Sequence, residues 1–114
     1  MNNPSPKDIL SFLTDDTSLD ILKLLDEKEY SIQQIASLLE LPVSSTYRKV
    51  NKLEQLRIIK KTKIIRNIDG TDESFYTSWI DEIKVSLKNN MISCNIKNKF
   101  QQDKIVRLWQ SFKQ

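Results

Sequence analysis

The side chains best suited to chemistry lie in a basic stretch, residues 43–68. This stretch holds eight lysine and arginine residues and one acid, which gives it a net charge of +7. Residues 1–42 carry −5 and residues 69–114 carry +1, so the positive charge of the chain is concentrated here. A positive surface of this kind can bind the phosphates of a nucleic acid. A basic stretch considered alone is more often a solvent-exposed face. Its structural context has to show whether it binds nucleic acid.

Two residues of the stretch can read DNA bases directly. The guanidinium of Arg48 matches the two acceptors of guanine in the major groove, and the amide of Asn51 matches the donor and acceptor of adenine. We expect Ser44 and Tyr47 to reach base edges beside them, and the other members of the set to contact phosphates. The predicted DNA-binding set is Ser44, Ser45, Tyr47, Arg48, Lys49, Asn51, Lys52, Lys60, Lys61, Lys63 and Arg66. The hydroxyls of residues 44–46 are interpreted as phosphate donors at a helix N-terminus, not as nucleophiles.

The composition leaves few ways to build a catalytic or metal site. The chain has no histidine, so the commonest general base and the Ser/His and Cys/His pairs are missing. Its single glycine cannot build a phosphate-binding loop, and its single cysteine, Cys94, cannot supply paired thiols for a metal. We therefore predict a protein that is not an enzyme and uses no cofactor and no metal. Cys94 is interpreted as packing material, with a thiol sensor in a dimer as the alternative.

Two short helices are predicted to position the basic side chains. Ser31-x-x-Gln34 predicts a capping box at the start of the first helix, which ends before Pro42 because the residue before a proline avoids the helical region. Its buried stripe consists of Ile32, Ile35, Ala36 and Leu39. The second helix turns Thr46, Val50 and Leu53 inward and leaves its polar and basic side chains outside. This pattern is a helix-turn-helix, and its coincidence with the basic stretch favours nucleic acid over a solvated face.

A β-hairpin is predicted to follow the second helix. Residues 58–67 are β-branched and basic, residues 67–72 supply turn formers that include Gly70, and residues 74–79 alternate like a returning strand. We interpret this hairpin as a wing. Three acids lie at its tip, so we expect Lys61, Lys63 and Arg66 to meet phosphates or a minor groove along the strand and not at the tip.

The chain resembles the winged helix-turn-helix regulators of the ArsR/MarR-like class over residues 31–79. The resemblance rests on Ile35-Ala36, Leu39, Ser44-Ser45-Thr46, Leu53-Glu54 and Ile58-Ile59. It implies a winged-helix transcriptional regulator. Glu40 takes the place of the glycine that is usual in the turn, so we expect a turn built without a free residue at positive φ. Pro42 replaces the usual serine cap, which leaves the start of the second helix undefined by one residue in either direction.

The flanks of this core are predicted from caps and periodicity. Ser5-Pro6 predicts the start of an N-terminal helix, which either lies across a partner subunit, as the resemblance implies, or covers its own core. Thr17-x-x-Asp20 predicts the start of the next helix, which is apolar nearly all round. Alternation on both sides of Asn89-Asn90 predicts a second hairpin, with a helix over residues 81–87 as the alternative.

Residues 98–113 are predicted to form a C-terminal helix. Its apolar stripe, at i, i+3, i+4 and i+7, consists of Ile105, Leu108, Trp109 and Phe112. We predict a homodimer interface at this stripe, because contiguous apolar patches seldom stay exposed on monomers. Docking of the helix onto the chain's own sheet is the alternative.

These patterns predict an α+β fold: a winged helix-turn-helix with an N-terminal helix, a wing hairpin, a second hairpin and a C-terminal dimerisation helix. We expect one domain over residues 1–114, divided into an N-terminal arm (1–16), the winged core (17–79), the extra hairpin (80–97) and the C-terminal helix (98–114). Without a membrane span or a secretion signal, we expect a cytoplasmic protein. The predicted function is transcription regulation through sequence-specific binding of double-stranded DNA, as a homodimer on a pseudo-palindromic site. A protein-interaction module in a transcription-related assembly is the alternative.

Overall fold

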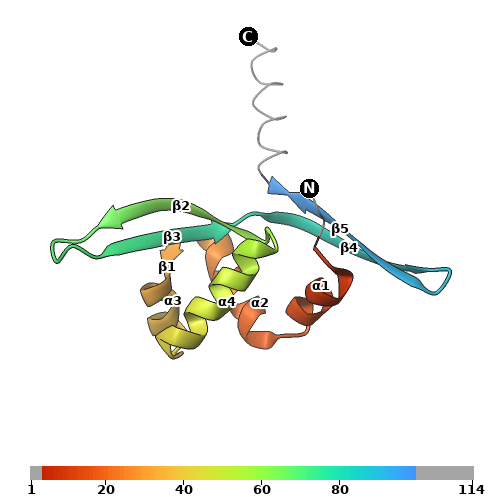
Figure 1. The fold of residues 1–114 in the computed structure, drawn as a ribbon, viewed down its shortest axis with the longest axis horizontal. Coiled ribbons are helices and arrows are strands. Elements are labelled where there is room, and N and C mark those ends of the chain that lie inside the picture. The colour runs from red at the N-terminus through yellow and green to blue at the C-terminus, as the bar shows by residue number, and fades with distance from the viewer. Residues whose placement is uncertain (1–3, 100–114) are drawn as a thin grey trace, which may run out of the picture.

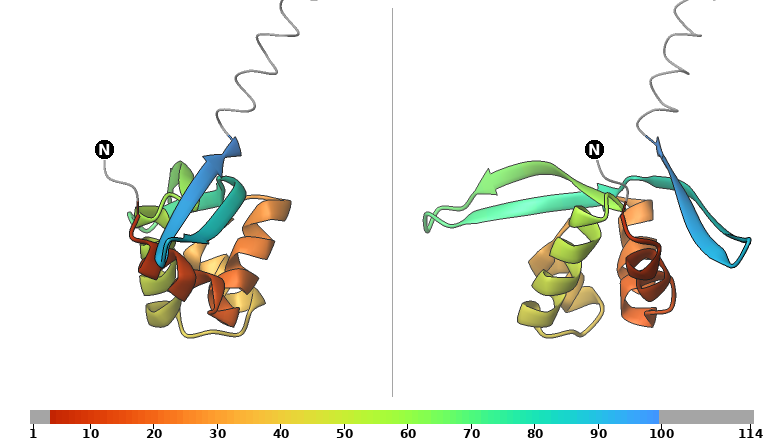
Figure 2. Two further views of the ribbon diagram at one scale, coloured as in Figure 1. Left: turned by 90° about the vertical axis from the view of Figure 1, so that its right-hand side faces the viewer. Right: turned by 45° about the vertical axis from the view of Figure 1, so that its right-hand side comes forward.

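The structure is a computed structural model that describes residues 4–99. Its elements are α1 (Pro6–Leu13), α2 (Asp16–Glu27), β1 (Tyr30–Ser31), α3 (Ile32–Leu38), α4 (Val43–Gln55), β2 (Ile59–Arg66), β3 (Asp72–Ser78), β4 (Ile80–Lys88) and β5 (Met91–Asn98). Within this range the helices form one layer, and two hairpins extend from it in opposite directions (Figures 1 and 2). The predicted α+β winged-helix class is confirmed. The stripe predicted for the C-terminal helix, Ile105, Leu108, Trp109 and Phe112, lies outside the described residues.

The helix-turn-helix consists of α3 and α4, and its first helix starts with the predicted capping box. Ser31 Oγ accepts a hydrogen bond from the Gln34 amide nitrogen at 3.2 Å, and Gln34 Oε1 accepts one from the Ser31 amide nitrogen at 3.0 Å. The second helix begins at Val43 with Pro42 as its N-cap, and no side chain caps it. Proline is tolerated at the start of α4 although it has no N–H group. The first amide groups of a helix have no hydrogen-bond partner inside the helix, so none is lost.

The turn between α3 and α4 differs from the expected one. Glu40 has a φ of 55°, which places it in the left-handed region that the turn was expected to avoid. The turn closes as a Schellman motif, in which the Leu41 amide donates to the Ala36 carbonyl at 2.8 Å and the Glu40 amide to the Ser37 carbonyl at 3.3 Å. The geometry therefore requires a positive φ even without glycine, and Glu40 adopts it at some cost in free energy.

We expect Glu40→Gly to raise the free energy of unfolding by about 0.5–1 kcal/mol. Glycine avoids the left-handed strain of about 1–2 kcal/mol, while its freedom in the unfolded chain offsets about 0.4–1 kcal/mol of that gain. Ser37→Gly, at an exposed position of α3, is the matched control and should lower stability by about 0.5–1 kcal/mol. Urea titration measures both variants, and a destabilised Glu40→Gly would contradict the strain at this turn.

The first helix, α1, starts as predicted. Ser5 is its N-cap and Pro6 opens the helix, and Ser5 Oγ accepts a hydrogen bond from the Lys7 amide at 3.2 Å. Ile9 and Phe12 are buried in the chain's own core, at 0% and 5% exposure. Of the two roles considered for this helix, covering its own core is therefore the one that the structure shows.

The second helix starts earlier than predicted from Thr17. It begins at Asp16, and Asp15 is the N-cap, whose carboxylate accepts a hydrogen bond from the Ser18 amide at 3.1 Å. Aspartate caps helices at least as well as threonine. Two overlapping cap signals therefore occur in the same segment, and the first of them starts the helix.

The core lies between the helices and the inner ends of the strands. Its fully buried large side chains are Ile9, Ile21, Leu25, Ile35, Val50, Leu53, Ile58 and Ile59. Ala36 is 3% exposed, as expected for the small residue at the contact between α3 and α4. The predicted inward faces of both helices of the helix-turn-helix are thus confirmed.

The wing is a three-stranded antiparallel sheet in the order β1-β3-β2. β2 and β3 form the predicted hairpin, and Gly70 has a φ of 88° in its turn. The two-residue strand β1 was not predicted; its residues Tyr30 and Ser31 pair with Tyr76 and Phe75. This pairing joins the start of α3 to the base of the wing.

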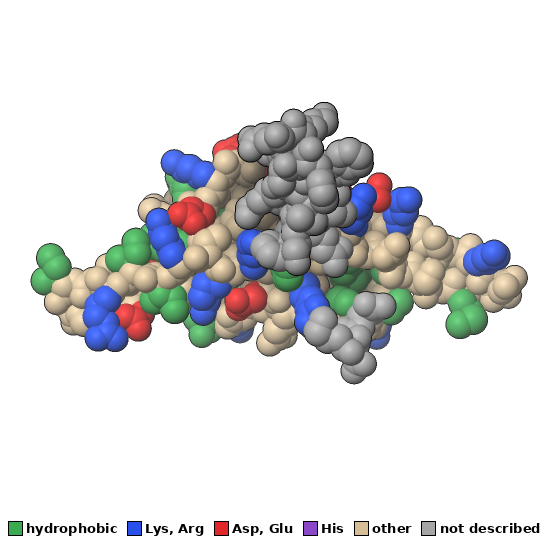
Figure 3. Space-filling model, turned by 90° about the horizontal axis from the view of Figure 1, so that it is seen from above, with side chains coloured by type: hydrophobic (Ala, Val, Ile, Leu, Met, Phe, Trp, Pro, Cys, Tyr) green, Lys and Arg blue, Asp and Glu red, His purple; other side chains and the backbone are tan. Residues whose placement is uncertain are grey.

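The second hairpin is formed by β4 and β5, so the alternative of a helix over residues 81–87 is wrong. Asn89 and Asn90 make its two-residue turn with φ values of 53° and 61°, as predicted. The side-chain amide of Asn98 fixes the base of the hairpin by donating to the carbonyls of Arg57 and Trp79 at 3.1 and 3.0 Å. Seen from above, lysine and arginine side chains are spread along both hairpins (Figure 3).

Candidate nucleic-acid interface

The solvent-facing side of α4 carries four polar side chains in one stripe. Ser44, Arg48, Asn51 and Gln55 follow each other at helical spacing, opposite the buried Thr46, Val50 and Leu53. Asn51 is half-buried and the other three are exposed. Gln55 was not predicted as a site residue, although extending the same period by one more turn would have found it. We call these four residues the outward stripe.

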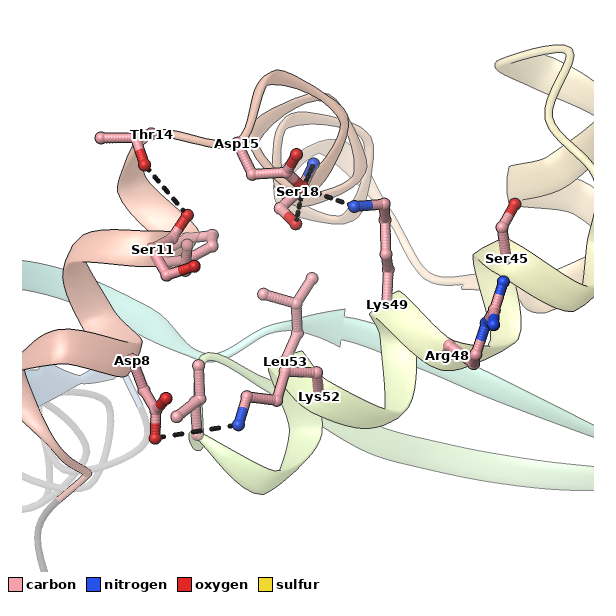
Figure 4. A pocket seen from close by; sticks show the side chains of 12 residues that line it. Asp8, Ser11, Thr14, Asp15, Ser18, Ser45, Arg48, Lys49, Lys52 and Leu53 are labelled. Carbon is pink, nitrogen blue, oxygen red and sulfur yellow. Dashed lines mark hydrogen bonds and ion pairs between the residues drawn. The ribbon is translucent and has the colours of Figure 1, made fainter.

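Arg48 is the charged member of the outward stripe. Within residues 4–99, no hydrogen bond or ion pair engages its guanidinium, and the side chain is exposed. Figure 4 shows it beside Ser45, further from Asp15 than Lys49 is, and no ion pair joins it to Asp8 or Asp15. Its donors are therefore available to a ligand that approaches α4 from solvent.

The flank of α4 that faces α1 is arranged differently. Lys49 Nζ lies 2.7 Å from Asp15 Oδ2, and Lys52 Nζ lies 3.8 Å from Asp8 Oδ2. Both lysines border an open hollow of about 600 Å³ between α1, the start of α2 and α4 (Figure 4). Their side chains are 36% and 54% exposed, so the pairs lie at the surface and are not buried. The acids Asp8 and Asp15 thus face the basic helix.

The Lys49–Asp15 pair is formed at neutral pH. The hydrogen bond from Lys49 lowers the pKa of the Asp15 carboxyl, and the hydrogen bond from the Ser18 hydroxyl adds to this effect. A carboxyl with a lowered pKa contributes stability above its ordinary pKa, and that contribution is lost as the pH falls through the lowered value. The stabilisation from this pair is therefore present at neutral pH and lost in acid, and at neutral pH a phosphate competes with the Asp15 carboxylate for Lys49.

The hydroxyls at the start of α4 do not all point outward. Thr46 is fully buried, and its hydroxyl donates to the Pro42 carbonyl at 2.8 Å, so its predicted role as a phosphate donor is wrong. The hydroxyl of Ser45 donates to the same carbonyl at 3.1 Å. Such back-bonding is usual for serine and threonine in helices. Ser44 is the exposed hydroxyl of the three.

A bulge at Thr62 divides the lysines of β2 between the two faces of the wing. Lys61 lies opposite Tyr76 and Lys63 lies opposite Phe75, and directly opposed residues share a face of the sheet. Because Tyr76 and Phe75 are neighbours in β3, Lys61 and Lys63 lie on opposite faces. Residues two apart in a regular strand would share one face, so the bulge is what separates these two lysines.

The wing cations also have partners within the chain. Lys63 Nζ lies 2.8 Å from Glu29 Oε1, and Arg66 Nε lies 3.2 Å from Asp72 Oδ1, with every side chain at least one third exposed. Lys60 Nζ lies 5.7 Å from the centre of the Trp79 ring, and Lys61 Nζ lies 5.9 Å from that of Tyr76. The hydrogen bond from Lys63 lowers the pKa of Glu29. Exposed pairs of this kind are weak enough for an anionic ligand to replace them.

Tyr47 lies on the opposite flank of α4 from Lys49, near the wing. Burial raises the pKa of the Tyr76 hydroxyl, and the charges of Glu54 and Tyr47 raise it further. Both of these α4 residues are thus close enough to act on a wing residue. Tyr47 itself is 54% exposed.

The predicted site residues thus fall into three groups. Ser44, Tyr47, Arg48 and Asn51 lie on α4 toward solvent or the wing; Ser45, Lys49 and Lys52 lie toward α1, and Arg48 also borders the hollow on that side; Lys60, Lys61, Lys63 and Arg66 lie along β2. No group of three or more potential metal ligands occurs among residues 4–99. The helices described in this range are too short or too polar to cross a membrane.

Residues 15–61 match the family model described as "Bacterial regulatory protein, arsR family". This segment contains the helix-turn-helix of α3 and α4. It runs from the N-cap of α2, through β1, α3 and α4, into the first residues of β2. The resemblance inferred from the sequence is confirmed. No curated protein matches the chain.

Solved structures of other proteins share the fold of this chain. HlyU from Vibrio cholerae in its reduced form is 24% identical with a TM-score of 0.53, and the alignment covers 63% of this chain and 70% of HlyU. NolR from Sinorhizobium fredii is 20% identical with a TM-score of 0.52, covering 68% and 81%. A possible transcriptional regulator from Methanosarcina mazei Go1 is 17% identical with a TM-score of 0.54, covering 92% and 78%. At these identities the likeness shows the fold alone.

Proposed function

We propose that this chain regulates transcription in the cytoplasm by binding double-stranded DNA in a sequence-specific way. The observation that carries the proposal is the outward stripe of α4, which presents Arg48 and Asn51 to solvent on an ArsR-type winged helix. The matching family is one of regulatory proteins, and the similar protein from Methanosarcina mazei is described as a possible transcriptional regulator. A regulator with this surface reads DNA through it.

In the proposed complex α4 enters the major groove. The width of that groove admits one helix, whose outward side chains then meet the base edges. Arg48 donates to guanine and Asn51 pairs with adenine, while Ser44 and Tyr47 reach neighbouring edges. Gln55 lies on the same stripe and extends this contact toward the C-terminal end of α4.

The lysines on either side of α4 contact the phosphates. Lys49 and Lys52 flank the helix on the α1 side, and Lys61 flanks it on the wing. Lys60, Lys63 and Arg66 extend the positive charge along β2, with Ser45 at the start of α4. Phosphate contacts fix the position of the protein on the duplex, and they carry most of the affinity for random sequence.

The proposed active form is a homodimer. Two copies related by a two-fold axis bind a pseudo-palindromic site whose half-sites lie one helical turn apart, about 34–36 Å. We place Ile105, Leu108, Trp109 and Phe112 at the interface, because their spacing gives an apolar stripe that needs cover.

A salt titration of DNA binding tests the proposal. Fluorescence anisotropy with a labelled random duplex should show binding at low salt, and the logarithm of the binding constant should fall linearly with the logarithm of salt concentration by about 0.9 for each phosphate contacted. Selection from a random library should then yield one preferred site with two-fold symmetry. If no duplex binds even at low salt, the proposed function is wrong.

Asp15→Asn is expected to tighten binding to random duplex by about 0.2–1 kcal/mol, the usual strength of an exposed ion pair. The change removes the carboxylate that holds Lys49, and asparagine keeps the N-cap of α2. The salt dependence should also steepen, by at most about one phosphate contact.

Asp16→Asn is the matched control for Asp15→Asn. It removes the same charge from the adjacent exposed residue, and within residues 4–99 no ion pair engages Asp16. Any general effect of the lost charge should be equal in the two variants. Equal affinities for the two variants would show that Asp15 does not compete with DNA for Lys49.

A further inference from the structure

One face of the second hairpin is a continuous apolar strip. Cross-strand partners Ile83 and Ile96, Val85 and Cys94, and Leu87 and Ile92 are directly opposed, so all six side chains share a face. The opposite face is polar and includes the pairs Lys84–Asn95 and Ser86–Ser93. We call the six residues the hairpin strip. Antiparallel strands with one apolar and one polar face commonly pack the apolar face against other protein groups.

Only the inner half of the hairpin strip is covered within residues 4–99. Ile83, Cys94 and Ile96 pack against the core that includes Ile9 and Phe12 of α1. The outer half extends beyond the helices (Figures 1 and 2), and Val85, Leu87 and Ile92 are 43%, 72% and 47% exposed. A two-stranded hairpin has little stability of its own in water, so an uncovered apolar end is unfavourable.

The last described residue is held at the base of the hairpin. The Lys99 amide donates to the Trp79 carbonyl at 2.9 Å, and its ammonium forms an ion pair with Asp26 at the end of α2. The chain beyond Lys99 therefore starts about 20 Å from Ile92, since six residues of a strand separate Ile92 from Asn98. A helix about 10 Å wide that returns along the same strip would meet the inner half, which the core already fills.

We propose that the C-terminal segment of a second copy covers the outer half of the hairpin strip. The lengths agree: the apolar stripe predicted from Ile105 to Phe112 would span about 11 Å at helical rise, and the outer half from Val85 to Lys88 spans about 10 Å. A second copy reaches the strip from its open end, and the two-fold axis repeats the contact reciprocally. This inference rests on the homodimer of the proposed function and names the surface that forms it.

Cross-linking between single-cysteine variants tests the exchange. In a Cys94→Ser background, a size-tagged Leu87→Cys chain is mixed with an untagged Leu108→Cys chain and treated with a short bismaleimide. Cysteine remains a small apolar side chain at both positions. We expect a product with the summed mass of the two different chains. A double variant that carries both cysteines in one chain should give cross-links between two chains in preference to a cross-link within one chain.

Three other outcomes would each overturn the inference. A product from Leu87→Cys alone would show hairpin packing on hairpin, and one from Leu108→Cys alone would show a seam between two C-terminal segments. A loop inside the double variant without the mixed product would show that the chain covers its own strip. Absence of every product would equally exclude the exchange.

A pair of charge variants gives an independent measurement by solution mass. Leu87→Asp should shift the protein toward monomer, whereas Ser86→Asp, on the polar face of the same strand, should leave the mass unchanged. Circular dichroism checks that both variants fold. A dimeric Leu87→Asp protein would overturn the inference but leave the homodimer standing. A monomeric wild-type protein would contradict the homodimer itself.

Discussion

Ile35→Ala is expected to lower the free energy of unfolding by about 2–5 kcal/mol, the usual cost of emptying a large buried position. The side chain of Ile35 is 0% exposed and belongs to the core on which α3 and α4 rest. Alanine at this position leaves a cavity in that core. A chain of this size has a total stability of about 5–15 kcal/mol, so the loss is a large part of it. Urea denaturation should show a lower midpoint with an unchanged slope.

Leu38→Ala is the control for Ile35→Ala. Leu38 lies three residues further along the same helix, but its side chain is 55% exposed. We expect this change to stay within about 0.5 kcal/mol of wild type, as is usual for surface positions. If Leu38→Ala were as destabilising as Ile35→Ala, a surface outside residues 4–99 would have to cover Leu38.

The elements that the sequence predicted well are those in which local signals agree. In α3 the capping box and the apolar stripe indicate the same start and the same buried face, and the structure has both, although the helix ends at Leu38, before the limit that Pro42 sets. The second hairpin is similar, because the Asn89-Asn90 turn and the alternation on either side fix one register. Agreement between independent local signals leaves few alternatives.

The features that the sequence did not predict depend on tertiary contacts. The strand β1 has only two residues, too few for any alternation to appear, and it exists because it pairs with β3. The bulge at Thr62 changes no residue type, yet it moves Lys63 to the opposite face from Lys61. Periodicity also cannot show that Asp15 approaches Lys49, because 34 residues separate them in the chain.

For the candidate site, the sequence predicted what depends on local spacing and missed what depends on tertiary contacts. Helical spacing alone placed Arg48 and Asn51 on the outside of α4, and the structure places them on the outward stripe. The partners of Lys49, Lys52 and Lys63 required the fold. These partners matter for function. A lysine in an ion pair has to break that pair before it contacts a phosphate, so it adds less affinity for DNA than an unpaired lysine.

Arg48→Ala is expected to weaken binding to the preferred site by about 1–3 kcal/mol and to relax the preference at one base pair. Arg48 is the one guanidinium on the outward stripe of α4, and a bidentate contact to guanine has this strength. Site selection with the variant should return the same site with one position randomised. Lys60→Ala should instead weaken all sequences equally and reduce the salt dependence, because a phosphate contact carries no sequence information.

Lys23→Ala is the control that separates specificity from charge. Lys23 is exposed on α2 and does not lie on α4 or the wing, and the change removes one positive charge, as Arg48→Ala does. Both variants lose the same long-range attraction, which salt screens. Only the Arg48 variant should alter the order in which different duplexes are preferred. If Arg48→Ala lowers affinity but keeps that order, α4 contacts the backbone of the duplex, and the bases must be read from another element.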